Sequence, residues 1–327
     1  MAKCNAIPFV LASLVAASPA AAADALEAAG TIELPSVKGR IDHFGADAGR
    51  HRVLVAALGN DSVEVVDVRG RRRERSLSGF GEPQGILYVP GVDRVFVANG
   101  SADRVDILDG ASLARIKSIA GLGDADNVRY DAAANRVWVG YGKGALRALD
   151  PSTGETAAEI ELSGHPESFQ LETRGSRIFV NVPTAGQVAV VDRAKGAVIA
   201  RWSVPAKANF PMALDEAGKR LFVGARRPAV LLVYDTGSGK VVARVPIGED
   251  TDDLFFDAAR KRVYVVCGGG RVDVLGQDGA DHYTVEGSVR TAPRARTGLF
   301  VADESALYVA APASGGAPAR LIVYRAR

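Results

Sequence analysis

The chain has 327 residues, with 40 Lys and Arg against 38 Asp and Glu, and 47% of its residues are hydrophobic. Such a balanced charge argues against a broad nucleic-acid or anionic-lipid surface, because polyanion binders usually carry a basic surplus. The length permits two domains, but large all-β domains also reach it as one.

Residues 1–23 are predicted to be a secretory signal peptide. Lys3 supplies the positive start, and the apolar stretch 6–17 is too short to span a bilayer comfortably. The alanines at 21–23 match a cleavage site before Asp24. No later stretch is apolar and long enough for a membrane helix. We therefore expect a periplasmic or secreted, soluble monomer with no membrane span after cleavage and no nucleic-acid partner.

Cleavage would leave Cys267 as the only cysteine, so an internal disulfide is excluded for the mature chain. Cys267 ends the apolar run "RVYVVC" at 262–267. This setting favours a buried structural thiol over a reactive one.

From residue 40 onward the chain repeats itself. The phrase "RVFVANGSADRVDILD" at 94–109 returns as "RVWVGYGKGALRALD" at 136–150. Each copy has an apolar anchor residue that follows a basic one, except that Ala306 replaces the basic residue in the last copy. The seven anchors are spaced by 42, 42, 41, 43, 42 and 44 residues, and they are Val53, Val95, Val137, Ile178, Leu221, Val263 and Leu307.

Each copy reads as four short strands. In the second copy these are 85–89, 94–99, 104–108 and 115–120, rich in β-branched and aromatic residues and separated by Gly, Asp, Asn and Ser. A period of about 42 residues with four strands is typical of a β-propeller blade. The sequence therefore predicts an all-β, seven-bladed β-propeller with four antiparallel strands per blade.

The seventh copy is one strand short. It ends with "RLIVYRAR" at 320–327, whereas the mature N-terminus has a spare apolar segment, "TIEL", at 31–34. A propeller must pair its first and last blades or leave open edges. We expect the N-terminal segment to supply the missing strand, so that residues 24–327 form one domain.

Two further features of the repeat have structural interpretations. An Asp ends the third strand in five copies and is expected to accept backbone N–H bonds in the following turn; these are Asp67, Asp109, Asp150, Asp192 and Asp235. The run "RGRRRER" at 69–75 is placed beside the outer strand of the first copy, where cations protect an edge from pairing. The alternative for that run is an anion-binding patch.

The phrases "RVFVANGSADRVDILD" and "RLFVGARRPAVLLVYD", with the links "GEPQGI" and "GHPESF", resemble the WD40-like YVTN-repeat β-propeller proteins of bacteria. The resemblance extends from about residue 30 to 327 and implies the propeller fold. It does not select an activity, because that superfamily includes exported binding proteins, cofactor-enzyme domains and lactone-cleaving enzymes.

Function is expected where the inner strands enter the central channel. The residues eleven and ten positions before each anchor differ most among the copies, and they differ by charge. We predict a ligand-binding channel mouth formed by Asp42, His43, Gln84, Asp126, Asn127, Glu167, Asp252, Asp253 and Arg296. Four of its carboxylates are candidate ligands for Ca²⁺ or another divalent cation, namely Asp42, Asp126, Glu167 and Asp252.

Three interpretations of the function remain. The first is a hydrated, polar channel mouth that binds no ligand. The second, which we favour, is a binding or scaffold module for a small molecule or a periplasmic protein. The third is a metal-dependent, lactonase-like hydrolase or lyase, similar in site position to the regucalcin and gluconolactonase propellers. His43 and His165 both lie near the expected rim, but no nucleophile–base pair identifies catalytic residues.

Overall fold

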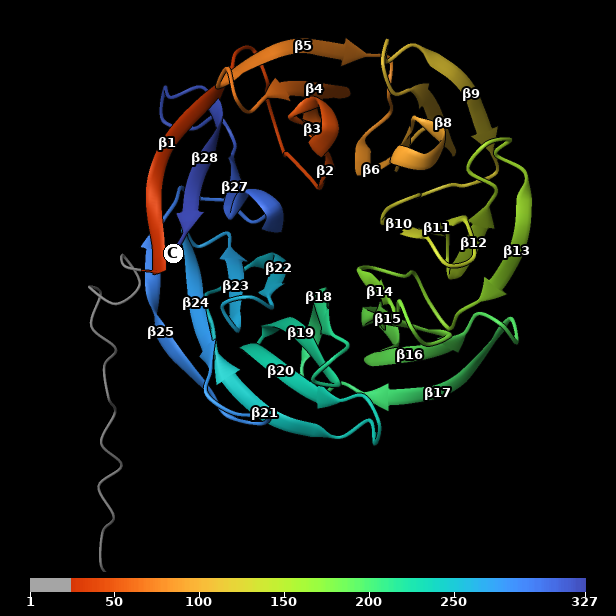
Figure 1. The fold of residues 1–327 in the computed structure, drawn as a ribbon, viewed down its shortest axis with the longest axis vertical. Coiled ribbons are helices and arrows are strands. Elements are labelled where there is room, and N and C mark those ends of the chain that lie inside the picture. The colour runs from red at the N-terminus through yellow and green to blue at the C-terminus, as the bar shows by residue number, and fades with distance from the viewer. Residues whose placement is uncertain (1–24) are drawn as a thin grey trace, which may run out of the picture.

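The computed structural model describes residues 25–327 as seven four-stranded antiparallel sheets arranged around a central axis (Figure 1). This confirms the predicted seven-bladed propeller. The predicted signal peptide lies outside the described residues. Among residues 25–327, no helix has the length and apolar character needed to cross a membrane.

In each blade the first strand lies nearest the axis and the fourth forms the rim (Figure 1). The first three blades comprise β2 (Phe44–Asp47), β3 (Arg52–Ala57), β4 (Ser62–Asp67) and β5 (Arg72–Ser78); β6 (Pro83–Val89), β7 (Arg94–Asn99), β8 (Arg104–Asp109) and β9 (Arg115–Ala120); β10 (Val128–Asp131), β11 (Arg136–Tyr141), β12 (Ala145–Leu149) and β13 (Thr156–Glu161). The next three comprise β14 (Phe169–Leu171), β15 (Arg177–Val182), β16 (Gln187–Asp192) and β17 (Ala197–Ser203); β18 (Lys207–Asp215), β19 (Arg220–Arg227), β20 (Ala229–Asp235) and β21 (Val241–Pro246); β22 (Thr251–Asp257), β23 (Arg262–Cys267), β24 (Arg271–Gln277) and β25 (Tyr283–Arg290).

The seventh blade combines both ends of the chain. It contains β26 (Gly298–Val301), β27 (Ala306–Ala311), β28 (Ala319–Ala326) and, outermost, β1 (Leu26–Leu34). β1 pairs antiparallel with β28 from Leu26 opposite Ala326 to Leu34 opposite Ala319. The predicted closure by the N-terminal strand is confirmed, and the strand is longer than the segment 31–34 that indicated it.

Short 3-10 helices occupy some of the loops. Three of them connect first and second strands, namely η1 (Ala48–Arg50), η3 (Pro90–Val92) and η5 (Ala302–Glu304), and two connect second and third strands, namely η2 (Leu58–Asn60) and η4 (Pro183–Ala185).

The repeat follows from packing between neighbouring blades. All seven anchor residues are buried, and each hydrophobic cluster is shared by adjacent sheets. Val53 of β3, for example, belongs to one cluster with Tyr308 and Leu321 of the seventh blade. Each blade must present similar apolar faces to two neighbours, which explains why the phrase recurs.

The basic residue before the anchor connects blades. Arg52 donates to the carbonyl oxygen of Gly110 at 2.5 Å, and Arg177 donates to that of Thr236 at 2.5 Å. Arg220 donates to the carbonyl of Ala280, also in the following blade, at 3.0 Å. These contacts explain why a cation recurs at this position of the repeat.

The turn interpretation of the repeated Asp residues is confirmed. Asp109 Oδ1 accepts hydrogen bonds from the backbone N–H groups of Ala111 at 3.2 Å and Ser112 at 2.8 Å. Asp150 accepts in the same way from Ser152 and Thr153.

The arginine run holds the closing strand. Arg71 donates to the carbonyl oxygen of Ala29 in β1 at 2.5 Å, and Arg73 donates to that of Pro35 at 2.7 Å. Arg73 also pairs with the buried Glu64 at 3.0 Å. These arginines therefore join the first blade to the N-terminal segment of the seventh.

Cys267 is fully buried and free, as expected. Burial raises the pKa of its thiol to about 12, which leaves almost no thiolate at neutral pH.

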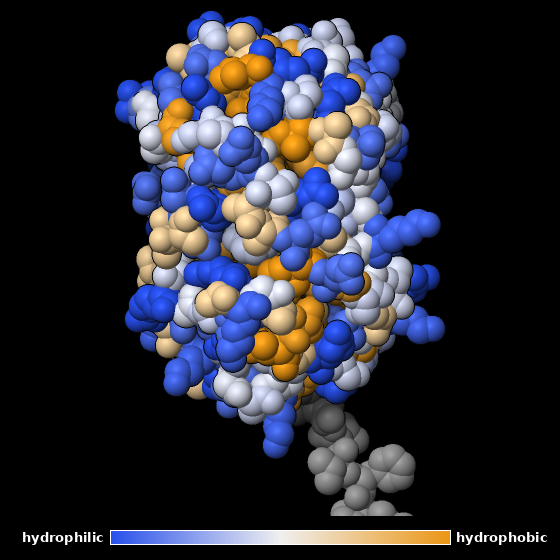
Figure 2. Space-filling view, turned by 90° about the vertical axis from the view of Figure 1, so that its right-hand side faces the viewer, coloured by the Kyte–Doolittle hydropathy of each residue, from blue (hydrophilic) through white to orange (hydrophobic). Residues whose placement is uncertain are grey.

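The rim of the ring is mixed in polarity. Figure 2 shows one side of the molecule, where several separate apolar patches are divided by polar and charged side chains. The exposed large hydrophobic residues lie on outer strands, with Ile116 on β9 and Ile199 on β17.

Candidate functional site

Two sets of loops meet at the predicted mouth. The loop that enters the first strand of a blade and the loop between its second and third strands are joined by backbone hydrogen bonds. Gly59 N–H donates to the carbonyl oxygen of Arg40 at 2.9 Å, and Gly142 N–H donates to that of Gly123 at 2.8 Å. Equivalent bonds at 2.9 Å join the loops of the second and sixth blades. This repeated bonding fixes where the entry residues stand.

His43 lies at the centre of the predicted residues. Its Nδ1 is 3.1 Å from Asp253 Oδ1, and its Nε2 is 3.6 Å from Asp42 Oδ1 and 3.8 Å from Asp126 Oδ1. Asn127 Nδ2 lies 3.4 Å from the same Nε2. The structure thus brings together five predicted residues from the first, third and sixth blades.

The imidazole of His43 supplies positive charge among these acids. Burial lowers the pKa of His43, but the carboxylates of Asp253 and Asp42 outweigh it, and the pKa lies well above its ordinary value. The acids around His43 therefore favour its protonated, positively charged form. Its positive charge offsets part of the repulsion among the mouth carboxylates.

Arginines pair with two of the four candidate metal ligands. Arg40 Nη2 is 2.8 Å from Asp42 Oδ2 and 3.6 Å from Asp252 Oδ2, and Arg226 Nη2 is 2.6 Å from Asp252 Oδ1. The Arg226 guanidinium also lies over the ring of Phe210, 4.3 Å from its centroid. Burial raises the pKa of Asp252 to about 6 against the opposing effect of Arg226.

The other two candidate ligands have a histidine beside them. Ligand atoms of Asp126, His165 and Glu167 all lie within 4.8 Å of one another. His165 Nδ1 donates to the carbonyl oxygen of Gly142 at 2.7 Å. Burial, followed by the carboxylates of Asp126 and Asp252, raises the pKa of Glu167 to about 8. Burial lowers the pKa of His165, but Asp126 and the Gly142 carbonyl raise it to about 9.

The remaining predicted residues lie at the periphery. Arg296 Nη2 pairs with Asp250 Oδ2 at 3.1 Å, and Gln84 Nε2 donates to the carbonyl oxygen of Ala125 at 3.5 Å. Within residues 25–327, neither forms a hydrogen bond or ion pair with His43.

The set of predicted site residues omitted Arg40, His165 and Arg226. Arg40 and His165 stand at one repeat position, two residues before Asp42 and Glu167. In the other five blades, the residue at this position has a positive φ; these residues are Glu82, Asp124, Ala208, Asp250 and Arg294. Arg40 and His165 depart from that backbone conformation, and both reach the mouth carboxylates. A cationic residue at this repeat position was the available sequence signal.

A pocket opens beside the mouth, between the fourth and fifth blades. Its volume is about 590 Å³, and His165 and Glu167 belong to both the pocket and the mouth. Phe210 contributes an aromatic wall, and Lys207 and Arg227 also line the pocket. Among residues 25–327, no carboxylate pairs with Lys207 or Arg227.

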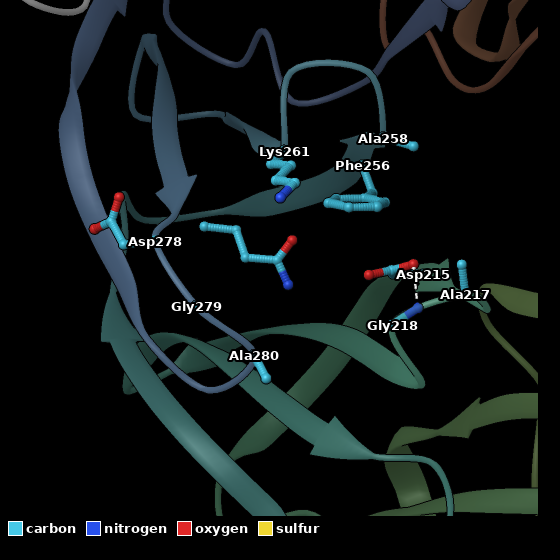
Figure 3. Close-up of a pocket in the computed structure, with 10 residues that line it drawn as sticks. Asp215, Ala217, Gly218, Phe256, Ala258, Lys261, Asp278, Gly279 and Ala280 are labelled. Atoms are coloured by element: carbon cyan, nitrogen blue, oxygen red, sulfur yellow. Dashed lines mark hydrogen bonds between the residues drawn. The ribbon is translucent and has the colours of Figure 1, made fainter.

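A second pocket, of about 400 Å³, lies on the opposite face between the fifth and sixth blades (Figure 3). The side chains of Phe256 and Lys261 border it, and Asp215 is turned to its own loop, where Oδ1 accepts from the Gly218 N–H at 2.8 Å (Figure 3). None of the predicted mouth residues lines this pocket. The candidate site is therefore the mouth with its adjoining pocket.

Comparison with known proteins identifies the fold. No family model matches the sequence, and no curated protein is similar enough to match it. A chain of the Kuenenia stuttgartiensis hydrazine synthase superimposes with a TM-score of 0.77 at 18% identity, covering 89% of this chain and 97% of that one. A chain of a mitotic checkpoint complex superimposes with a TM-score of 0.78 at 14% identity, covering 99% of each. At such low identity these similarities show a β-propeller and carry no activity with them.

Proposed function

We propose that this propeller is a binding module that takes a small organic anion into the pocket between the fourth and fifth blades. The observation that carries the proposal is the pair of cations, Lys207 and Arg227, that line this pocket without a carboxylate partner among residues 25–327.

The rest of the lining supports the same ligand class. Guanidinium and ammonium groups form charge-assisted hydrogen bonds with carboxylates, so Lys207 and Arg227 suit an acid group. Phe210, Pro183 and Ala185 provide apolar surface for the body of the ligand. A volume of about 590 Å³ falls within the usual range for small-molecule sites.

The test is calorimetric titration of the full chain with a panel of small carboxylic acids, each compared with its uncharged amide. We expect the acids to bind and the amides not to bind. Lys207→Gln and Arg227→Gln should each weaken binding by roughly fivefold to tenfold, as loss of one charged contact predicts.

Lys240→Gln and Arg201→Gln are the matched controls. Both residues are exposed, lie on the same two blades and are absent from the pocket. Equal effects of all four variants, or equal binding of acids and amides, would refute the assignment of the pocket. A protein ligand on this face would instead tolerate the pocket variants and depend on mouth residues outside it.

A metal-dependent hydrolase is the second candidate, favoured by the close approach of Asp126, His165 and Glu167. It predicts turnover of a lactone panel that a chelator abolishes and added metal restores. Binding of the acids without any such turnover favours the first proposal.

We also propose that the module works outside the cytoplasm and belongs with the YVTN-repeat propellers. The N-terminal residues 1–23 support export, and the strand–turn–Asp phrase of each copy supports the family assignment. Neither assignment depends on the ligand.

A further inference from the structure

We propose that Asp126, His165 and Glu167 form a binding site for one divalent transition-metal ion, with Zn²⁺ as the best-fitting probe. This site keeps Asp126 and Glu167 of the four carboxylates that the sequence analysis suggested for Ca²⁺ or another divalent cation, and it adds His165 in place of Asp42 and Asp252. It does not depend on the organic anion proposed above, because the ion alone should bind.

The spacing of the donors fits a shared ion. Asp126 Oδ2 lies 3.9 Å from His165 Nε2, which is too long for a hydrogen bond. Two ligands that each stand about 2.0–2.2 Å from one tetrahedral zinc ion are about 3.3–3.6 Å apart, so Asp126 and His165 would need to approach by about 0.3–0.6 Å to share the ion. Glu167 brings a third ligand atom, and all three lie within 4.8 Å of one another.

The backbone orients His165 for this role. The carbonyl oxygen of Gly142 accepts a hydrogen bond from Nδ1 at 2.7 Å, which directs Nε2 toward Asp126. Gly142 is itself held by its N–H bond to Gly123. Metal-binding histidines commonly donate their second ring N–H to a backbone carbonyl, which fixes the tautomer. A metal ion would take the place of the proton on Nε2.

Asp126 supplies independent support for a ligand. Its side chain is only 6% exposed. Oδ1 accepts a hydrogen bond from Asn127 Nδ2 at 3.3 Å, whereas Oδ2 stands 3.9 Å from its ion-pair partner, His165 Nε2. Within residues 25–327, Oδ2 of this nearly buried side chain has only a long ion pair with His165, and a cation placed between the two groups would satisfy both.

The donor atoms indicate which class of metal would bind, and the adjoining pocket leaves one coordination position of that metal accessible to a further ligand. Imidazole with two carboxylates suits Zn²⁺ or Mn²⁺, whereas Ca²⁺ prefers an all-oxygen shell of six to eight ligands. His165 and Glu167 also line the pocket, so a further coordination position would face it. Zinc sites with three protein ligands keep such a position open.

The experiment is calorimetric titration of the chelator-stripped full chain with Zn²⁺, Mn²⁺ and Ca²⁺ separately. We expect one site per chain, with Zn²⁺ bound most tightly and Ca²⁺ most weakly. No binding of Zn²⁺, or tighter binding of Ca²⁺ than of Zn²⁺, overturns the proposal.

Variants locate the site. His165→Ala and the nearly isosteric Glu167→Gln should each reduce Zn²⁺ affinity by at least about 100-fold, the upper end of what outer-shell partners cost. His282→Ala is the matched control, because His282 is an exposed histidine 3.4 Å from Asp278, in the loop between β24 and β25 on the face opposite the mouth. Retained affinity in Glu167→Gln, with native circular dichroism, overturns the site even if His165→Ala fails to fold.

The two proposals can fail separately. Lys207→Gln and Arg227→Gln should leave Zn²⁺ binding unchanged, since neither residue is a ligand. Loss of Zn²⁺ binding in these variants as well would place the ion elsewhere in the pocket and refute the proposed ligand set. Carboxylate binding by a chain that never binds Zn²⁺ would refute the metal site alone.

Discussion

Acidic and basic side chains alternate around His43, and the charge state of each one depends on the residues that contact it. Asp42 and Asp252 face Arg40 and Arg226, while Asp126 faces His165. The sequence placed the acids at equivalent repeat positions. Their chemical states differ because the cations beside them come from different loops.

Gly85 shows how closely the mouth is packed. It occupies the repeat position of His43 and Asn127, and a β-carbon there would stand 2.1 Å from the carbonyl oxygen of Asp126. We expect Gly85→Ala to lower the free energy of unfolding by about 2–3 kcal/mol, because backbone must move to admit the methyl group. Urea denaturation measures this difference.

Gly91→Ala is the control for that change. A β-carbon at Gly91 would meet no atom within 4 Å, and Gly91 has no positive φ. Its unfolding free energy should stay within about 0.5–1 kcal/mol of the parent, with any change toward greater stability. Equal destabilisation by both alanines would show that the close approach to Asp126 is not the cause.

At the level of secondary-structure elements, hydrogen bonds join the loops of adjacent blades. Glu216, between β18 and β19, accepts hydrogen bonds from the Thr173 N–H at 2.8 Å, the Thr173 hydroxyl at 2.5 Å and the Arg174 N–H at 2.9 Å. Burial opposes the charged form, but these bonds outweigh it and lower the pKa of Glu216 to about 2. The carboxylate therefore links the fourth blade to the fifth.

A pH-dependent stability follows from this link. Because the folded pKa is depressed, the stabilisation is fully present above the ordinary pKa of 4.5 and is lost as pH falls toward about 2. Glu216→Gln should cost about 1–2 kcal/mol at pH 7, and the difference from the parent should shrink between pH 5 and pH 3. Urea denaturation at each pH measures it, with the exposed Glu155→Gln as control. A difference that is constant over this range would contradict the assigned role.

The closing strand is the second test at this scale. β1 buries Leu26, Ile32 and Leu34, and burial of each such side chain is worth about 1.5–3 kcal/mol. Deleting residues 25–36 should therefore lower the unfolding free energy by at least about 5 kcal/mol and remove the acceptors of Arg71 and Arg73. Glu33→Ala, an exposed change within the same strand, should have little effect. An unchanged melting transition after the deletion would mean that the seventh blade is stable with three strands.

Export concerns the whole molecule. The alanines before Asp24 predict that signal peptidase cleaves between residues 23 and 24. Intact mass of the protein exported from a bacterial host should therefore correspond to residues 24–327. Ala23→Arg should leave the precursor uncleaved, since the site requires a small residue there. A full-length mass for the exported parent would refute the predicted signal peptide.

Much of the fold was predictable because blades repeat. Seven buried anchors at one period, with a final strand missing and a spare apolar segment at the start, define the ring and its closure. The channel mouth was predictable for a related reason. Equivalent repeat positions converge on the axis, and Asp42, His43 and Asp126 do meet there.

The cationic side chains that contact the mouth acids and line the pocket could not be predicted from the repeat in the same way. Lys207 and Arg227 flank the pocket because β18 and β19 extend toward the mouth. The sequence repeat does not indicate that these two strands are longer than their equivalents. Arg40 and His165, which reach the acids, also differ in backbone conformation from the equivalent residues of the other five blades. Such departures depend on how two loops pack, so they cannot be counted along a chain.

The amino-acid sequence by itself determined the number of blades, the strands of each, the closure and the ring position of the polar residues. Those features repeat along the chain, so the pattern of buried positions can be predicted from the sequence alone. Only the tertiary structure decided which acid meets Arg40, which meets His165, and which cations border the pocket without a carboxylate. Each of those outcomes depends on ångström-scale distances between side chains from different blades, and charge interactions in a buried site change strongly over such distances.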